Sequence, residues 1–166
     1  MNSLATHRFY AGFLLVGMAA VIAAVLAFQH IGGYIPCKLC LEQRQPYYAA
    51  IPVALIALAL PARPAALMVV RLLFAAIAVA MAVTMVLAIY HAGVEWNWWL
   101  GPTDCGATGG NISADVGDLL NDLAATRPPA CDEAAGRFLG LSFAGWNVVA
   151  SAVFLAVAAK AAFRPV

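Results

Sequence analysis

Residues 9–28 read FYAGFLLVGMAAVIAAVLAF, a run of 20 residues without a charged side chain. A helix of that length crosses the hydrocarbon core of a membrane. Further apolar runs lie at about residues 45–62, 72–91 and 141–162. The sequence therefore predicts an all-α fold, an integral membrane four-helix bundle that forms a single membrane domain over residues 1–166.

The overall composition excludes several classes of protein. The chain is 64% hydrophobic and 10% charged, whereas about a quarter of the residues in a soluble domain are charged. Such a chain is not expected to bind nucleic acid, to form a soluble enzyme with a large core or to act as a disordered scaffold. A membrane β-barrel is also excluded, because its strands are short and alternate between apolar and polar residues.

The charged residues are distributed unevenly along the chain. Basic residues without acidic neighbours flank one side of the predicted spans: Arg8, Arg63, Arg71, Lys160 and Arg164. All eight acidic residues fall in the other two loops, at about residues 29–44 and 92–140. Because basic residues beside short loops stay in the cytoplasm, both termini are predicted to be cytoplasmic and both of these loops external.

Part of the second external loop has a helical pattern. Val116, Leu119, Leu120 and Leu123 recur at helical spacing, and Pro128 follows them. The pattern predicts a short amphipathic helix. This helix either packs against the top of the bundle or lies on the membrane surface.

All four cysteines lie in the predicted external loops, Cys37 and Cys40 in the first and Cys105 and Cys131 in the second. Thiols outside the cytoplasm tend to be oxidised, and proximity favours Cys37 with Cys40 and Cys105 with Cys131 among the three possible connectivities. Closing a loop as short as Cys-x-x-Cys stabilises a fold by only about 2 kcal/mol. That spacing instead lowers the pKa of one thiol and favours disulfide exchange. Structural disulfides and a four-thiolate zinc site are the alternatives.

Two further residues are candidates for a role in the chemistry of the first cysteine pair. If a helix begins at about Leu41, Cys40 lies near its N-terminus, where unpaired amides favour a thiolate, and Arg44 shares its face. An arginine at the edge of the hydrocarbon is costly unless it has an anionic partner or reaches the lipid headgroups. At the outer end of the third span, His91 is either a polar cap or a functional group.

Two motifs resemble those of the bacterial disulfide-bond-formation protein B (DsbB) family. The first consists of PCKLCLEQR at residues 36–44 and PYY at residues 46–48. The second consists of YHAGVE at residues 90–95, WW at residues 98–99 and GP at residues 101–102. Four spans, two external cysteine pairs and cytoplasmic termini match the family as well, so the resemblance covers essentially the whole chain.

The resemblance implies a protein-dithiol:quinone oxidoreductase of the bacterial inner membrane, a multi-pass protein with its active cysteines on the periplasmic side. Such a protein oxidises a DsbA-type periplasmic thiol oxidase and passes the electrons through two cysteine pairs to a membrane quinone, either ubiquinone or menaquinone. By this resemblance, Cys105 forms the mixed disulfide with the partner and Cys131 is its companion. Cys37 and Cys40 then carry the electrons onward, with Cys40 facing the quinone.

The resemblance also implies that Arg44 lies next to the quinone headgroup and that His91 lies at the quinone pocket. It implies no metal and no nucleic acid. A DsbI-like oxidase dedicated to one partner would share all these motifs, whereas vitamin K epoxide reductases usually have the opposite order of cysteine pairs. The non-enzymatic alternative is a four-span structural or transport protein with structural disulfides. Against transport, no predicted span has an ionisable residue near its centre.

Overall fold

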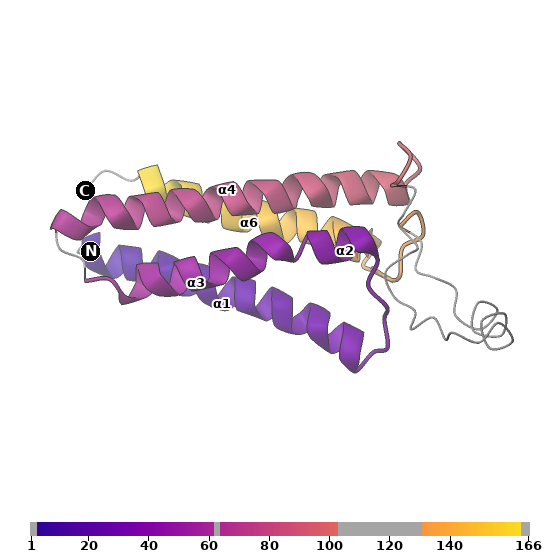
Figure 1. Cartoon of the computed structure of the whole chain (residues 1–166), viewed down its shortest axis with the longest axis horizontal. Helices are drawn as coiled ribbons and strands as arrows, with labels where there is room; N and C mark the ends of the chain where they lie inside the picture. The colour runs from indigo at the N-terminus through magenta and orange to yellow at the C-terminus, as the bar shows by residue number, and fades with distance from the viewer. Residues whose placement is uncertain (1–2, 62–63, 103–130, 164–166) are drawn as a thin grey trace, which may run out of the picture.

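The computed structural model describes residues 3–61, 64–102 and 131–163 (Figure 1). In chain order, its elements are α1 (Ser3–His30), α2 (Lys38–Glu42), α3 (Gln45–Ala59), α4 (Pro64–Glu95), β1 (Arg137–Phe138), β2 (Leu141–Ser142) and α6 (Phe143–Phe163). The described part of the chain is thus mostly helical, as the sequence predicts. The predicted amphipathic helix near residues 116–124 and the candidate Cys105 lie outside the described residues.

Within these ranges, three helices are long and apolar enough to cross a membrane: Thr6–His30, Ala66–Glu95 and Phe143–Phe163. They lie where the first, third and fourth spans are predicted. The helix at the predicted second span, α3, has only 15 residues. It ends at Ala59 because Leu60 is extended, with ψ of 134°, which is the conformation favoured immediately before a proline.

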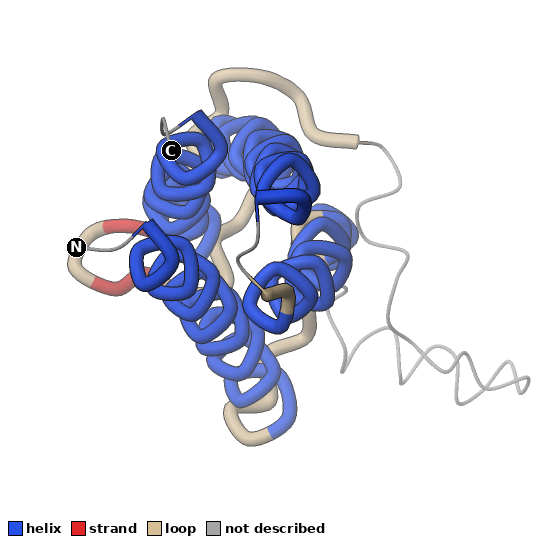
Figure 2. Tube along the Cα trace, turned by 90° about the vertical axis from the view of Figure 1, so that its left-hand side faces the viewer, coloured by secondary structure: helices blue, strands red, loops and turns tan. Residues whose placement is uncertain are grey.

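The long helices pack around a common core (Figure 2). α4 packs against α3 and α6, and α1 packs against the same two helices. Buried side chains follow one another at intervals of three and four residues along each helix, among them Leu14 and Met18, Ala50, Ala54 and Ala57, Phe74, Ile77 and Met81, and Phe154, Ala158 and Ala161. Small residues in α3 and α6 allow the helix backbones to approach closely. The core is therefore built from one apolar stripe per helix.

The two ends of the molecule differ in character. α1 begins and α6 ends at one end, whereas α2 and the last turns of α4 lie at the other (Figure 1). At that second end, β1 and β2 form a two-stranded antiparallel hairpin whose turn residues, Leu139 and Gly140, have φ of 51° and 84°, as a tight two-residue turn requires. Ser142 then accepts the backbone N–H of Gly145 at 3.1 Å and caps α6. This hairpin is not among the elements predicted from the sequence.

Tryptophans cover the last turn of α4. The ring of Tyr90 stacks on Trp99 with centroids 6.1 Å apart, and Trp99 Nε1 donates to the Tyr90 carbonyl at 2.8 Å. A Cβ at Gly93 would overlap the Trp99 indole, so the absence of a side chain there allows the ring to lie on the helix. Trp98 is 64% exposed, and exposed aromatic rings at a helix end are typical of a membrane–water interface.

Candidate thiol redox site

A small buried cluster lies at the end of the molecule that holds α2. It consists of Cys37, Leu39, Val94 and Cys131, with Cys40 and Tyr90 packed against it. The cluster brings the first predicted external loop, the end of α4 and the end of the second predicted loop into contact. Three of the four predicted site cysteines therefore lie together, and Cys105 lies outside the described residues.

The Cys-x-x-Cys motif forms the start of α2. The helix begins at Lys38 rather than near Leu41, and its N-cap is Cys37, whose Sγ accepts the backbone N–H of Cys40 at 3.2 Å. The helix thus begins about one turn earlier than expected, and Cys40 lies in its first turn, near a helix N-terminus as predicted. Cys37 is buried and Cys40 is only partly buried, so Cys40 is the more accessible sulfur of the pair.

The two thiols of this motif have opposite electrostatic environments. A hydrogen bond from the Cys37 side chain lowers the pKa of Cys40, and the positive charge of Arg44 lowers it further, against the opposing effects of burial and of Glu95. The same hydrogen bond, together with burial, raises the pKa of Cys37. Because the thiolate is the reactive form of cysteine, these shifts favour Cys40 over Cys37 as the nucleophile of a reduced pair.

A third cysteine, Cys131, lies close to the motif and to His91. Cys37 Sγ, a ring nitrogen of His91 and Cys131 Sγ all lie within 4.8 Å of one another, and all three residues are buried. Cys131 is disulfide-bonded, whereas Cys37 and Cys40 are free thiols. A thiol beside a disulfide sulfur is the arrangement required for thiol–disulfide exchange. In this oxidation state Cys131 does not supply the thiolate that a metal ion would need.

Both ring nitrogens of His91 have partners. Nε2 lies 3.7 Å from Cys37 Sγ and 3.8 Å from Glu95 Oε1, while Nδ1 lies 2.8 Å from Gln43 Nε2. His91 therefore contacts the buried sulfur of the motif directly. The ring is buried and held on both sides, and its role at a quinone pocket stays a prediction.

Arg44 is held by the neighbouring helix. Its Nη1 donates to Gln29 Oε1, near the end of α1, at 2.6 Å. The guanidinium is thereby fixed to the protein while its charge acts on Cys40. Arg44 thus has both a neutral partner and an anionic one once the Cys40 thiolate forms.

Several polar residues at this site are not among those predicted from the sequence. They are Gln29, Gln43, Tyr47, Glu95 and Asn147. Asn147 had a detectable signal, because a polar residue within an apolar span is costly unless it has a partner. Gln43 lies next to Arg44 inside the quoted motif, but its contact with His91 joins residues that are far apart in the sequence.

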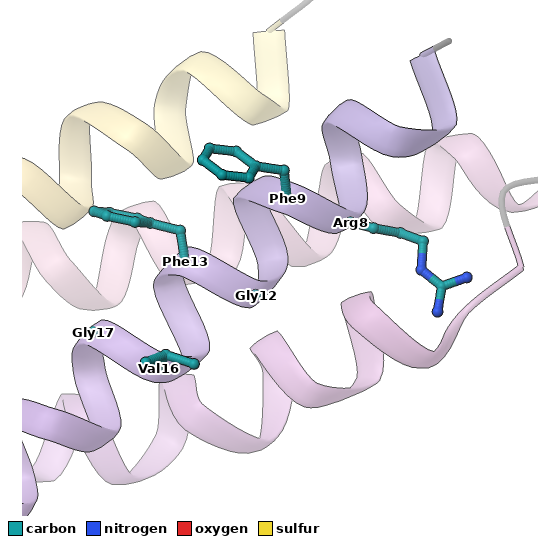
Figure 3. A pocket seen from close by; sticks show the side chains of 6 residues that line it. All are labelled: Arg8, Phe9, Gly12, Phe13, Val16 and Gly17. Atoms are coloured by element: carbon teal, nitrogen blue, oxygen red, sulfur yellow. The ribbon is translucent and has the colours of Figure 1, made fainter. Parts of the chain in front are cut away.

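Two surface hollows of the molecule lie away from this site. One of about 440 Å³ lies along α1 at the opposite end and is shown in Figure 3; it is lined by Arg8, Phe9, Gly12, Phe13, Val16 and Gly17. A second, of about 350 Å³, lies along α4 between Val79 and Leu87. Both are open and almost entirely apolar, as expected for grooves that face lipid tails, and neither includes a cysteine.

The family model described as disulfide bond formation protein DsbB matches residues 7–161. This range contains all or nearly all of each described helix and the whole cysteine cluster. The chain belongs to the DsbB family. Comparisons with curated proteins and with solved structures returned no match. As a DsbB-family member with helices of membrane length, the chain is a membrane thiol oxidoreductase of disulfide bond formation.

Proposed function

We propose that this DsbB-family chain oxidises a DsbA-type thiol oxidase and passes the electrons through its two cysteine pairs to a membrane quinone. One observation carries the proposal: the free thiol of Cys37 lies beside the disulfide-bonded Cys131. A structural disulfide needs no neighbouring thiol, whereas exchange between two cysteine pairs requires one. Two cysteine pairs in contact can exchange electrons without leaving the protein.

The proposed flow begins at the loop pair. A reduced partner loses two electrons and two protons as it gains its own disulfide, and the disulfide between Cys131 and the expected Cys105 opens to two thiols. Thiol–disulfide exchange then moves both electrons to Cys37 and Cys40. The quinone, when bound, supplies a two-electron, two-proton acceptor. The loop pair and the Cys-x-x-Cys pair are thus re-oxidised in turn.

The residues around Cys40 fit an acceptor of this kind. Cys40 is the lower-pKa, more accessible sulfur, and it lies at the end of a largely apolar bundle where a lipid-soluble molecule can arrive. The fixed guanidinium of Arg44 is suited to stabilise negative charge on a quinone oxygen. His91 contacts Cys37 and supports the buried partner of this pair.

The proposal includes the finer architecture expected from the sequence. Four helices, α3 included, lie in the bacterial inner membrane with both termini in the cytoplasm and the cysteines on the periplasmic side. The positions of the basic residues Arg8, Arg71 and Lys160 support this orientation. The N-terminus of α1 and the C-terminus of α6 lie at the same end of the molecule (Figure 1), which an even number of spans requires.

The proposed activity is tested by anaerobic mixing of the detergent-solubilised protein with a reduced DsbA-type partner and a soluble quinone analogue. Quinone absorbance and partner thiols are followed together. We expect equal loss of both, abolished by Cys40→Ser and retained in Glu42→Gln, a control on the same short helix. If the partner is not oxidised and both disulfides are inert to it, the non-enzymatic alternative with structural disulfides replaces the proposal.

A further inference from the structure

A chain of side-chain hydrogen bonds crosses the helix bundle at the end that holds α2. Tyr47 donates its hydroxyl proton to Asn147 Oδ1 at 2.8 Å, and Asn147 Nδ2 donates to Gln43 Oε1 at 2.7 Å. Gln43 Nε2 then lies 2.8 Å from His91 Nδ1. The chain joins α3, α6, the link between α2 and α3, and α4. It ends at the ring that touches Cys37.

Most of this chain is shielded from solvent. Tyr47 is 1% exposed, His91 3% and Gln43 5%. Buried polar groups require partners, and in such an environment each group constrains the orientation of the next. The chain is therefore a connected network in which the direction of one hydrogen bond determines the others.

The direction of donation determines where His91 holds its proton. Asn147 uses its carbonyl to accept from Tyr47, so its amide nitrogen faces Gln43. Gln43 in turn accepts with Oε1 and can offer only Nε2 to His91. An amide nitrogen donates and does not accept. The Nδ1 atom of His91 must therefore be an acceptor, and the neutral ring carries its hydrogen on Nε2.

We propose that Tyr47, Asn147 and Gln43 are positioning residues that hold the proton of His91 on Nε2 and direct it at the Cys37 sulfur. In this tautomer His91 is a hydrogen-bond donor to Cys37 and cannot act as its base. Glu95 Oε1, at 3.8 Å, is the other acceptor on the same side of the ring. The proposal rests on the proposed function only for the redox role of Cys37.

The Nε2–H group of His91 can assist Cys37 in its redox role. Closing the Cys37–Cys40 disulfide forms one S–S bond, delivers two electrons to the quinone and requires both sulfurs to lose their protons. The positive charge of Arg44 stabilises the Cys40 thiolate. Cys37 is buried and has no cation among the interactions that shift its pKa. An N–H group aimed at a sulfur stabilises its anion. His91 thus opposes the effect of burial on Cys37.

The tautomer is measured by ¹⁵N NMR of the full-length protein in detergent micelles with labelled histidine, because protonated and unprotonated ring nitrogens have separate shifts. In the wild type, we expect the bound proton of His91 on Nε2. At a pH where the new carboxyl group is ionised, Asn147→Asp leaves only acceptor oxygens at this position, so Gln43 must turn its amide nitrogen toward residue 147. Its Oε1 then faces His91, and the proton signal should move from Nε2 to Nδ1.

Two further variants test whether the effect passes through Gln43. In a Gln43→Leu background the chain is cut, so Asn147→Asp should cause no further change at His91. Tyr47→Phe retains the ring and removes only the hydroxyl, so a partial loss of the Nε2-protonated form is expected. Ser151→Ala is the matched control: its Oγ donates to the backbone carbonyl of Asn147 at 2.6 Å and not to its side chain, so the His91 signals should be unchanged.

The proposal is overturned if wild-type His91 holds its proton on Nδ1, or if Asn147→Asp and Tyr47→Phe both leave the His91 signals as they are. The two substitutions are close in size to the native side chains, and helical circular dichroism checks that each variant is folded. None of these spectra needs turnover. A wild-type protein that shows the expected shifts but reduces no quinone would retain the positioning network and lose the proposed function.

Discussion

The two cysteines of the motif have opposite electrostatic environments, chiefly because one hydrogen bond between them shifts their pKa values in opposite directions. Cys37 caps the helix and is buried, and the hydrogen bond that raises its pKa is the one that lowers the pKa of Cys40. The charge of Arg44 acts in the same direction on Cys40. Of the two thiols in the reduced pair, Cys40 therefore loses its proton more readily and Cys37 less readily.

This asymmetry predicts a ranked response of Cys40 to substitution. Both Cys37→Ala and Arg44→Gln should raise the pKa of Cys40, because each removes a group that stabilises the thiolate. The effect of Cys37→Ala should be larger, since that hydrogen bond is the leading cause of the shift. The measurement is the rate of Cys40 alkylation against pH in the fully reduced protein, resolved by mass spectrometry.

Arg8→Gln provides the control for this series, because it removes a positive charge at the opposite end of the bundle. Its alkylation profile at Cys40 should overlay that of the wild type. An Arg44→Gln profile that also overlays the wild type would remove Arg44 from the electrostatics of the thiolate.

At the residue scale, the sequence predicts the groups that are local in the chain. The Cys-x-x-Cys spacing and Arg44 follow from motif and helix geometry, and their interaction is present in the structure. Gln43 and Asn147 were missed because their hydrogen bond joins positions 104 residues apart. No pattern within one helix indicates which polar groups two helices will bring together.

At the scale of elements, helices are predicted better than their ends. The three helices of membrane length lie where apolar runs predict them, because burial in lipid depends on little beyond composition and length. The ends depend on caps and turns. α2 begins at a cysteine cap, α3 stops before Pro61, and α6 begins after a hairpin with a serine cap.

The close contact between α4 and its own tryptophan predicts a specific cost for a small side chain. Gly93→Ala places a methyl group where the Trp99 indole lies, so the ring must leave its stack on Tyr90. We expect a loss of about 1–3 kcal/mol in the free energy of unfolding and a change in tryptophan fluorescence. Thermal unfolding in detergent measures the first.

Gly12→Ala is the matched control for this substitution. Gly12 also lies within a helix, but a Cβ there would meet nothing within 4 Å. Alanine has the higher helix propensity, so this variant should be unchanged or more stable by up to about 1 kcal/mol. Equal melting temperatures for the two variants would show that Trp99 does not depend on the space at Gly93.

At the scale of the whole molecule, the polar chemistry is concentrated at one end. The cysteine cluster and the network from Tyr47 to His91 lie where α2 meets the end of α4. The rest of the described core is mostly apolar, with His7, Thr84 and Ser151 as buried polar residues. This division follows from the solvent, because polar groups in hydrocarbon must be satisfied within the protein. In the proposed orientation, the site lies where water, lipid and protein meet.

The short length of α3 has a consequence for the surrounding bilayer. Its 15 residues span only about 22 Å as a helix, less than the roughly 30 Å of an average hydrocarbon core. If α3 crosses the membrane as proposed, lipid beside it must thin or the start of the helix must sink. Thickness of the bilayer would then set how deeply Cys40 lies below the headgroups.

This hydrophobic mismatch predicts that lipid chain length controls access to Cys40. In vesicles of increasing acyl length, alkylation of reduced Cys40 by a water-soluble maleimide should slow, while a lipid-soluble maleimide should retain its rate. A cysteine placed at Ile31, which is 87% exposed in the first loop, should react equally in all vesicles. A Cys40 rate independent of chain length would place the site in water, whereas a graded rate would make the membrane itself a regulator of this thiol.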